Sequence, residues 1–344
     1  MPSLVELIDE DAARVAEAVD LSPLDGSSIL ITGASGLLGI TLLACLRHRM
    51  RVTGRPIEVT AVTHSPMPAV LRDLLDGPHI RLYQCDLADA ESCRSLPAAE
   101  HVIHAAGYGQ PGKFLENPAK TILLNTMATA ALLEGMSSDG KFLFVSSSEV
   151  YSGSPRGPHQ ESDIGTTDPA HPRACYIEGK RCGEAICHAF RGQGRDAKIA
   201  RLALAYGPGT RPDDQRVLNS VIRKGLLDRR IALLDQGDAR RTYCYLTDAV
   251  EMLLSILLYG REPVYNVGGR STTTILELAR AVGDILNVPV SRPERSEAVA
   301  GAPGDVSLDL SRYCTEFAKT DFVPMATGLE RTVGWQRELY RSIA

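Results

Sequence analysis

The sequence predicts a doubly wound α/β fold, in which helices cover both faces of a parallel sheet, with a smaller C-terminal region. Two observations carry this prediction. Runs of apolar and β-branched residues alternate with helical stretches between residues 28 and 145, and each run is continuously apolar, as in strands buried on both faces. A glycine-rich turn also joins the first of these strands to a helix, an arrangement typical of this fold.

The residue patterns place the expected elements along the chain. Residues 1–24 contain an amphipathic helix, whose apolar positions pack either within the chain or against another subunit. The last third of the chain is less regular, with helices expected within residues 211–230 and over residues 274–286. The expected strands, and the helix that follows the glycine turn, have these ranges: 28–32, 59–63, 80–83, 102–105 and 142–145 for strands, and 37–49 for the helix.

Composition and charge exclude several classes of protein. The 344 residues suggest about two domains. A net charge of −5, from 37 basic and 42 acidic residues, argues against binding to nucleic acid or to an anionic membrane. No apolar run approaches the roughly 20 residues of a membrane span, and the first residues do not resemble a signal peptide. The eight cysteines lack metal-ligand spacing, so we expect no bound metal and a cytoplasmic location.

The glycine turn has the spacing of a dinucleotide-binding loop. Gly33, Gly36 and Gly39 follow the first strand and open a helix, as G-x-x-G-x-x-G. Glycines allow a tight turn and a close approach of the backbone to a pyrophosphate. The loop residue Ser35 and the helix start at Leu37 then offer backbone N–H groups to the phosphates. The alternative is a strand-to-helix turn that merely requires glycine.

The adenosine end of the expected dinucleotide site is less distinctive. The second strand ends at residues 62–65 without the acidic residue that binds the ribose hydroxyls of NAD, and no arginine follows for the 2′-phosphate of NADP. We expect NAD, and NADP stays open. Asp86 and Leu87 follow the third strand and are expected near the adenine, although Asp86 could equally cap a helix.

A tyrosine, a lysine and a serine form the candidate reaction centre. Tyr176 and Lys180 lie four residues apart, and therefore on one face of a helix. A nearby ammonium is expected to lower the pKa of the phenol from about 10, which suits proton transfer near neutral pH. Ser147 ends the fifth strand, where this fold opens into its ligand crevice. A solvated helix face is the alternative for the Tyr–Lys pair alone.

Taken together, these motifs resemble those of the extended short-chain dehydrogenases/reductases that act on nucleotide sugars. The similarity runs from Ile29 to about Trp335 and includes TGASGLLG (32–39), HAAG (104–107), SSSEVY (146–151), YIEGK (176–180) and NVGG (266–269). It implies a helical extension over residues 1–24, a Rossmann-like domain over 25–205 with a returning segment near 242–262, and a mainly substrate-binding domain over 206–344. It also implies a homodimer, and a cofactor site lined by His104, Ala105, Ala106 and Lys180.

Within that superfamily the chain most closely resembles the UDP-glucuronate decarboxylases, through residues 117–121, 147–151 and 173–181. The resemblance implies transient oxidation of a nucleotide sugar at C4 by bound NAD, with Glu149 moving protons around C5 and C6. The residues that it assigns to catalysis are Ser147, Glu149, Tyr176 and Lys180, and those that it assigns to substrate binding are Asn125, Ser148, Tyr206, Arg216 and Arg241. A 4,6-dehydratase, a 4-epimerase and a non-catalytic dinucleotide-binding protein remain as alternatives.

Overall fold

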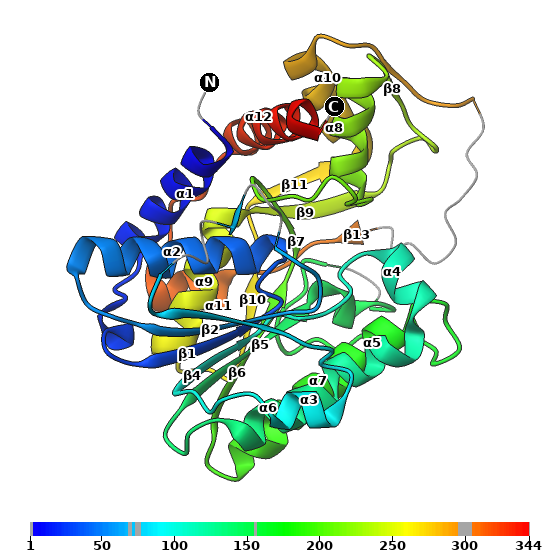
Figure 1. Cartoon of the computed structure of the whole chain (residues 1–344). Coiled ribbons are helices and arrows are strands. Elements are labelled where there is room, and N and C mark those ends of the chain that lie inside the picture. The colour runs from blue at the N-terminus through cyan, green and yellow to red at the C-terminus, as the bar shows by residue number, and fades with distance from the viewer. Residues whose placement is uncertain (1–2, 68–70, 73–76, 155–156, 295–304, 344) are drawn as a thin grey trace.

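A seven-stranded sheet forms the centre of the molecule (Figure 1). The computed structural model describes residues 3–67, 71–72, 77–154, 157–294 and 305–343. All six pairings between neighbouring strands are parallel, in the order β10-β6-β5-β4-β1-β2-β3. The strands are β1 (Ser28–Thr32), β2 (Glu58–Thr63), β3 (Ile80–Gln84), β4 (His101–His104), β5 (Lys141–Ser147), β6 (Asp196–Leu202) and β10 (Val264–Val267). The predicted fold class is confirmed, and the chain changes direction across the sheet between β1 and β4, where such folds bind ligands.

Helices cover both faces of the sheet. Successive residues of β1 point to opposite sides, so that Ile29 and Ile31 enter one apolar core and Leu30 enters the other. This burial on both faces explains why the strand runs are continuously apolar. The first core is covered by α1 (Leu4–Ala18), α2 (Leu37–Thr53) and α9 (Leu246–Tyr259). The second is covered by α3 (Ala90–Arg94), α5 (Pro118–Asn125), α6 (Met127–Gly135) and α7 (Ala174–Gly192).

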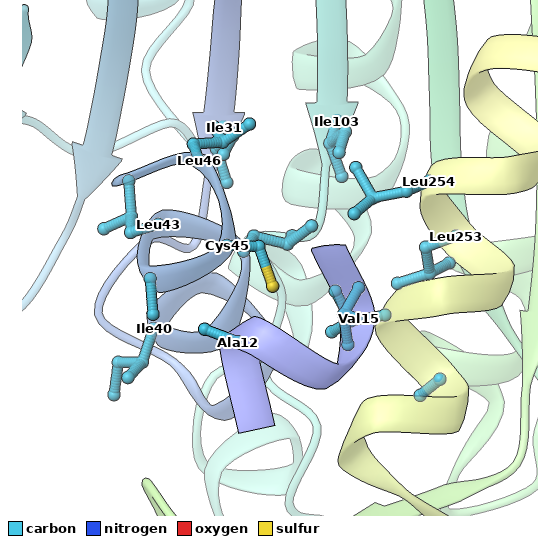
Figure 2. Close-up of a cluster of buried hydrophobic side chains, with 14 of the residues drawn as sticks. Ala12, Val15, Ile31, Ile40, Leu43, Cys45, Leu46, Ile103, Leu253 and Leu254 are labelled. Carbon is cyan, nitrogen blue, oxygen red and sulfur yellow. The ribbon is translucent and has the colours of Figure 1, made fainter. Parts of the chain in front are cut away.

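The N-terminal helix packs within the chain. Ser3 caps α1 in a reciprocal arrangement with Glu6. Figure 2 shows Ala12 and Val15 of α1 against Cys45 of α2 and beside α9. A short 3-10 helix, η1 (Ser22–Leu24), then leads into β1. Of the two possibilities for this helix, packing within the chain is the one observed.

The C-terminal region is built around a second, smaller sheet. Strand β9 (Arg240–Tyr245) is its centre and pairs with β7 (Leu204–Tyr206), β11 (Ser271–Thr274) and β13 (Asp305–Val306). The remaining elements of this region are α8 (Val217–Leu227), β8 (Ile231–Ala232), α10 (Ile275–Leu286), β12 (Val290–Ser291) and α12 (Met325–Ile343). Helix α11 (Ser311–Phe317) instead packs on the first core beside β10. The segment expected to return to the Rossmann-like domain, near 242–262, has different bounds in the structure. Strand β9 belongs to the second sheet, and the chain returns to the first sheet through α9 and β10. None of the described helices has the length and apolarity needed to cross a bilayer.

Two glycines with the same backbone conformation allow a test of the glycine turn. Gly33 and Gly26 both have positive φ, +71° and +78°, where an alanine is strained by about 1–2 kcal/mol. A Cβ on Gly33 would lie 2.9 Å from the carbonyl oxygen of Ala105, whereas a Cβ on Gly26 would meet nothing within 4 Å. We therefore expect Gly33→Ala to lower the melting temperature of the dinucleotide-free protein more than Gly26→Ala. Equal losses would show that contact with Ala105 does not constrain the turn.

Candidate functional site

The candidate site lies where β1, β4 and β5 end at the same edge of the sheet. Gly33 follows β1 and touches the backbone of Ala105, which follows β4. Ser147 ends β5, and the 3-10 helix η3 (Ser148–Tyr151) begins immediately after it. Parallel strands bring these loops together because their carboxyl ends all point to one edge.

The glycine turn forms a close-packed cradle at the start of α2. Gly36 is the N-terminal cap of α2, and Leu37 is its first residue. A Cβ on Gly39 would lie 2.4 Å from the carbonyl oxygen of Gly33, so only glycine allows the helix to approach the turn this closely. The first turn of a helix has N–H groups without helical partners and a partial positive charge. The cradle, with Ser35 at its tip, therefore fits the pyrophosphate of a dinucleotide.

His104 contributes to this edge from inside the fold. Its ring is fully buried, with Nδ1 2.7 Å from the hydroxyl of Thr32 and Nε2 2.9 Å from the carbonyl oxygen of Leu124. Burial lowers the pKa of His104 to about 4, so the ring is neutral. The same Thr32 hydroxyl accepts a hydrogen bond from the backbone N–H of Ala106 at 3.0 Å. His104 thus holds the backbone of Ala105 and Ala106 in place.

At the adenosine end, Asp86 is paired within the chain. Its carboxylate accepts hydrogen bonds from Lys120 Nζ at 2.7 Å and from the backbone of Ala88 at 3.0 Å, and the bond from Lys120 holds the pKa of Asp86 below its usual value. The residue that caps α3 is Asp89, so the capping alternative for Asp86 is wrong. The Leu87 side chain is buried in the second core. Both side chains therefore already contact other parts of the protein when no dinucleotide is bound.

Lys180 lies beneath Tyr176, as their spacing in α7 predicts. Its Nζ donates a hydrogen bond to the carbonyl oxygen of Val145 at 2.7 Å and lies 5.9 Å from the centre of the Tyr176 ring. The ammonium is buried, and this burial lowers the pKa of Lys180 to about 7. Lys180 is therefore only partly charged near neutral pH.

The pKa of Tyr176 differs in direction from the expectation. Burial of the hydroxyl raises the pKa above its usual value. A hydrogen bond with Ser147 and the charges of Arg173 and Arg216 oppose this rise, and Glu149 adds to it. The expected lowering by Lys180 is wrong for the chain by itself, because burial has the largest effect on the phenol. The contact between Ser147 and Tyr176 does bring the two expected hydroxyl groups together.

Glu149 has a partner that the motif analysis left without a role. Its Oε1 accepts a hydrogen bond of 2.6 Å from Nη2 of Arg173, and both side chains are mostly buried. The guanidinium also lies 5.4 Å from the centre of the Phe114 ring, from α4 (Pro111–Glu116). Phe114 in turn stacks on Tyr176, with ring centres 4.9 Å apart. Arg173 caps the start of α7, three residues before Tyr176, and opens the stretch 173–181 that carries the resemblance, although nothing in that stretch indicated its contact with Glu149.

The expected substrate-binding residues divide into two groups. Arg216 lies near Tyr176 and Tyr243, with its guanidinium bound to Asp214 and to the carbonyl oxygen of Ala205. Arg241, on the second sheet, donates a hydrogen bond to the carbonyl oxygen of its neighbour Arg240 at 2.7 Å. Ser148 is buried at the start of η3.

Two other expected substrate ligands are enclosed by protein. Tyr206 is buried in the core of the C-terminal region, edge-on to Tyr243 and Tyr245, which argues against direct contact with a substrate. Asn125 is fully buried at the end of α5, where it donates a hydrogen bond to the carbonyl oxygen of Thr121 and packs near Gly179 of α7. Both side chains therefore shape the site from behind its surface.

A buried polar network supports the turn that carries Glu149. Arg201 binds the carboxylate of Glu184 at 2.7 Å and the hydroxyl of Tyr151 at 2.9 Å. Ser146 also donates to Glu184, and Tyr151 donates to Asn266 at 2.7 Å. These bonds join α7, β5, β6, β10 and η3 directly below the site.

Comparisons with known proteins agree with this arrangement. Residues 29–268 match the model of the NAD dependent epimerase/dehydratase family. The chain is 28% identical over 309 residues to UDP-glucuronic acid decarboxylase 1 of Arabidopsis thaliana, covering 89% of this chain and 68% of that protein. It is 30% identical over 327 residues to dTDP-4-dehydro-6-deoxy-D-allose reductase of Streptomyces bikiniensis, covering 91% and 97% respectively.

A solved structure shares the same fold. The UDP-glucuronic acid 4-epimerase from Bacillus cereus, in complex with UDP-glucuronic acid and NAD, superposes with a TM-score of 0.76. The match covers 91% of this chain and 100% of that chain, at 23% sequence identity.

The lowered pKa of Lys180 predicts a pH-dependent stability. Between pH 7 and 10.5 the unfolded chain carries a proton on Lys180 that the folded chain has released, so stability rises with pH across this range. Relative to Lys180→Met, the dinucleotide-free wild type should gain about 2 kcal/mol of unfolding free energy between pH 7 and 9. Urea unfolding at both pH values measures this gain.

The control is Lys224→Met, because Lys224 also donates to a backbone carbonyl, that of Ala232, but at the surface. Its difference from wild type should stay constant between pH 7 and 9. A constant difference for Lys180→Met as well would contradict the lowered pKa.

Proposed function

This chain belongs to the NAD dependent epimerase/dehydratase family, and from that membership we propose that it converts UDP-glucuronate to UDP-xylose by decarboxylation. One observation carries the proposal. The hydroxyls of Ser147 and Tyr176, suited to oxidation at C4, lie near Glu149, whose Oε2 is buried and has no hydrogen-bond partner among the described residues. Such a carboxylate can exchange a proton at the neighbouring ring carbon. The similarity to UDP-glucuronic acid decarboxylases supports this choice.

The first step is oxidation of the sugar at C4. The glycine cradle at residues 33–39 would hold the pyrophosphate of NAD, which, when bound, accepts the C4 hydride. Ser147 orients the C4 hydroxyl, and Tyr176 takes its proton. Lys180, beneath the phenol ring, stabilises the phenolate. Arg241 and Arg216 supply positive charge for the diphosphate of the substrate.

The second step uses the ketone at C4. The C6 carboxylate is then β to a ketone, and it leaves as carbon dioxide while the electron pair of the C5–C6 bond moves onto the C4 oxygen as an enolate. C5 next takes a proton, which Glu149 delivers and water replaces. Tyr176 then returns its proton to the C4 oxygen, and the bound cofactor would return the hydride to C4 to complete UDP-xylose.

A 4,6-dehydratase or a 4-epimerase is the second candidate, since both begin with the same oxidation at C4. The fold shared with a UDP-glucuronic acid 4-epimerase favours its inclusion. The epimerase and the dehydratase differ in their later steps at C5 and C6. An epimerase leaves C6 in place, whereas a dehydratase eliminates water. Product analysis therefore distinguishes them.

The test is incubation of the purified protein with UDP-glucuronate and NAD, with carbon dioxide and the nucleotide sugar measured by mass spectrometry. We expect a UDP-pentose, and a fall of about 1,000-fold in its rate of formation in Tyr176→Phe, because general acid–base catalysis is lost. Tyr259→Phe is the control, since the Tyr259 hydroxyl binds the carbonyl oxygen of Asp20 away from the site. A UDP-hexuronate with inverted C4 would identify an epimerase. Absence of oxidation with any nucleotide sugar would favour a binding protein.

We further propose that the protein is a homodimer that pairs through α5 and α7. These helices pack against each other on one face of the sheet, and Ile122 and Leu123 of α5 are 42% and 40% exposed. Exposed apolar side chains on a helix pair suit a self-complementary contact. Light scattering at micromolar concentration should give twice the chain mass for wild type and a monomer for Ile122→Lys/Leu123→Lys. Leu227→Lys, on α8, should remain dimeric, and a monomeric wild type would refute the proposal.

A further inference from the structure

The contacts of Arg173 link two parts of the candidate site that come from different elements. Its Nη2 binds Glu149 Oε1 at 2.6 Å, at the turn after β5. Its guanidinium also lies on the Phe114 ring, which stacks on Tyr176 with an interplanar angle of 12°. Phe114 is 1% exposed, so it is fixed by the core around it. One guanidinium therefore contacts both the carboxylate and the ring that supports the phenol.

Arg173 and Glu149 are joined by one hydrogen bond, from Nη2 to Oε1. An arginine commonly binds a carboxylate with two parallel hydrogen bonds. Here Oε2 of Glu149 and Nε of Arg173 are both buried, and neither has a hydrogen-bond partner among the described residues. An acceptor and a donor are thus left over on two groups whose charges both act on Tyr176. A water molecule or a sugar hydroxyl that reached these atoms would satisfy both, because it can donate to Oε2 while it accepts from Nε.

A purely structural role is already filled by a different arginine. Arg181 of α7 donates hydrogen bonds to the backbone carbonyls of Val150 and Ser152, at 2.7 and 3.0 Å from Nη2. These two residues flank the end of η3, the turn that carries Glu149. Arg181 anchors the backbone of the turn, whereas the guanidinium of Arg173 is bonded to the side chain of Glu149. Arg181 therefore fixes the position of the turn, and Arg173 fixes the orientation of the Glu149 carboxylate.

We propose that Arg173 is a positioning residue that holds Oε1 of Glu149, so that Oε2 receives a proton through a water molecule bound by Arg173 Nε and delivers it to C5 of the sugar. This proposal rests on the proposed function and assigns its C5 step. The water first relays a proton from solvent to Oε2. After carbon dioxide leaves, that proton passes from Oε2 to C5 of the enolate, and Glu149 returns to its carboxylate form. Oxidation at C4, by Tyr176 and Ser147, does not pass through this pair.

The test separates the two half-reactions in deuterium oxide. With UDP-glucuronate, Arg173→Met should form product about 100-fold more slowly than wild type, and the decarboxylated 4-keto intermediate should accumulate as its enolate. Oxidation at C4 should slow far less than product formation, although loss of the Arg173 charge also raises the pKa of Tyr176, and deuterium should enter C5 correspondingly slowly. Arg173→Lys should recover about tenfold of the lost rate, since an ammonium can bind Oε1 but has no second donor in the position of Nε.

Two controls make the result specific. Arg181→Met should lower the melting temperature without accumulation of the 4-keto sugar. Glu149→Gln combined with Arg173→Met should be no slower than Glu149→Gln alone, because both changes act on one proton transfer. Equal losses in the two half-reactions, or multiplied losses in the double variant, would overturn the proposal.

The experiment also distinguishes this proposal from the decarboxylase proposal. A wild type that oxidises C4 and incorporates deuterium at C5 without releasing carbon dioxide would refute decarboxylation, and Arg173→Met would still be expected to slow that incorporation. A wild type without C5 exchange would overturn the role of Arg173. If no sugar is oxidised, the pair is tested by unfolding: additive melting-temperature losses in the double variant would show that Arg173 and Glu149 are uncoupled, and overturn it.

Discussion

The attachment of α7 to the sheet is the interaction on which the site depends. Lys180 donates to the Val145 carbonyl, and Glu184, one turn later, binds both Ser146 and Arg201. A Cβ on Gly183 would lie 2.5 Å from the Phe144 ring, so the missing side chain allows the helix this close to β5. The helix is therefore held at one distance from β5, and Tyr176 is held near Ser147.

This attachment places charged groups where water cannot reach them. The Glu184 carboxylate and the Arg201 guanidinium satisfy each other, and further hydrogen bonds complete their pairing. Among the residues that the structure describes, Lys180 has no carboxylate within ion-pair distance, and its Nζ donates instead to the neutral carbonyl oxygen of Val145. Its pKa consequently falls to about 7, whereas the hydrogen bond with Glu184 raises the pKa of Arg201 above its usual value. A lysine with this pKa beside a phenol can gain or lose its proton when a charged ligand binds nearby.

The two ends of the chain brace the fold from outside the region that matches the family. Asp11 of α1 accepts a hydrogen bond from Tyr245 at 2.9 Å and pairs with Arg331 of α12 at 3.0 Å. Tyr245 ends β9 immediately before α9, so this cluster ties the second sheet to the helices over the first. The family match begins at residue 29 and ends at residue 268, and α1 and α12 both lie beyond it. They connect the two sheets mechanically without entering the candidate site.

The sequence by itself determined the features that depend on local spacing. The glycine turn, the apolar strands and the four-residue interval between Tyr176 and Lys180 are patterns within one element, and the structure contains each of them. Tertiary structure decided the rest, because burial and long-range contacts involve segments far apart in the chain. It enclosed Tyr206 in the core, turned His104 into a neutral brace, raised the pKa of Tyr176 through desolvation, and brought Arg173 and Phe114 to the reaction centre. The spacing of residues along the sequence does not determine how far folding removes water from a given hydroxyl.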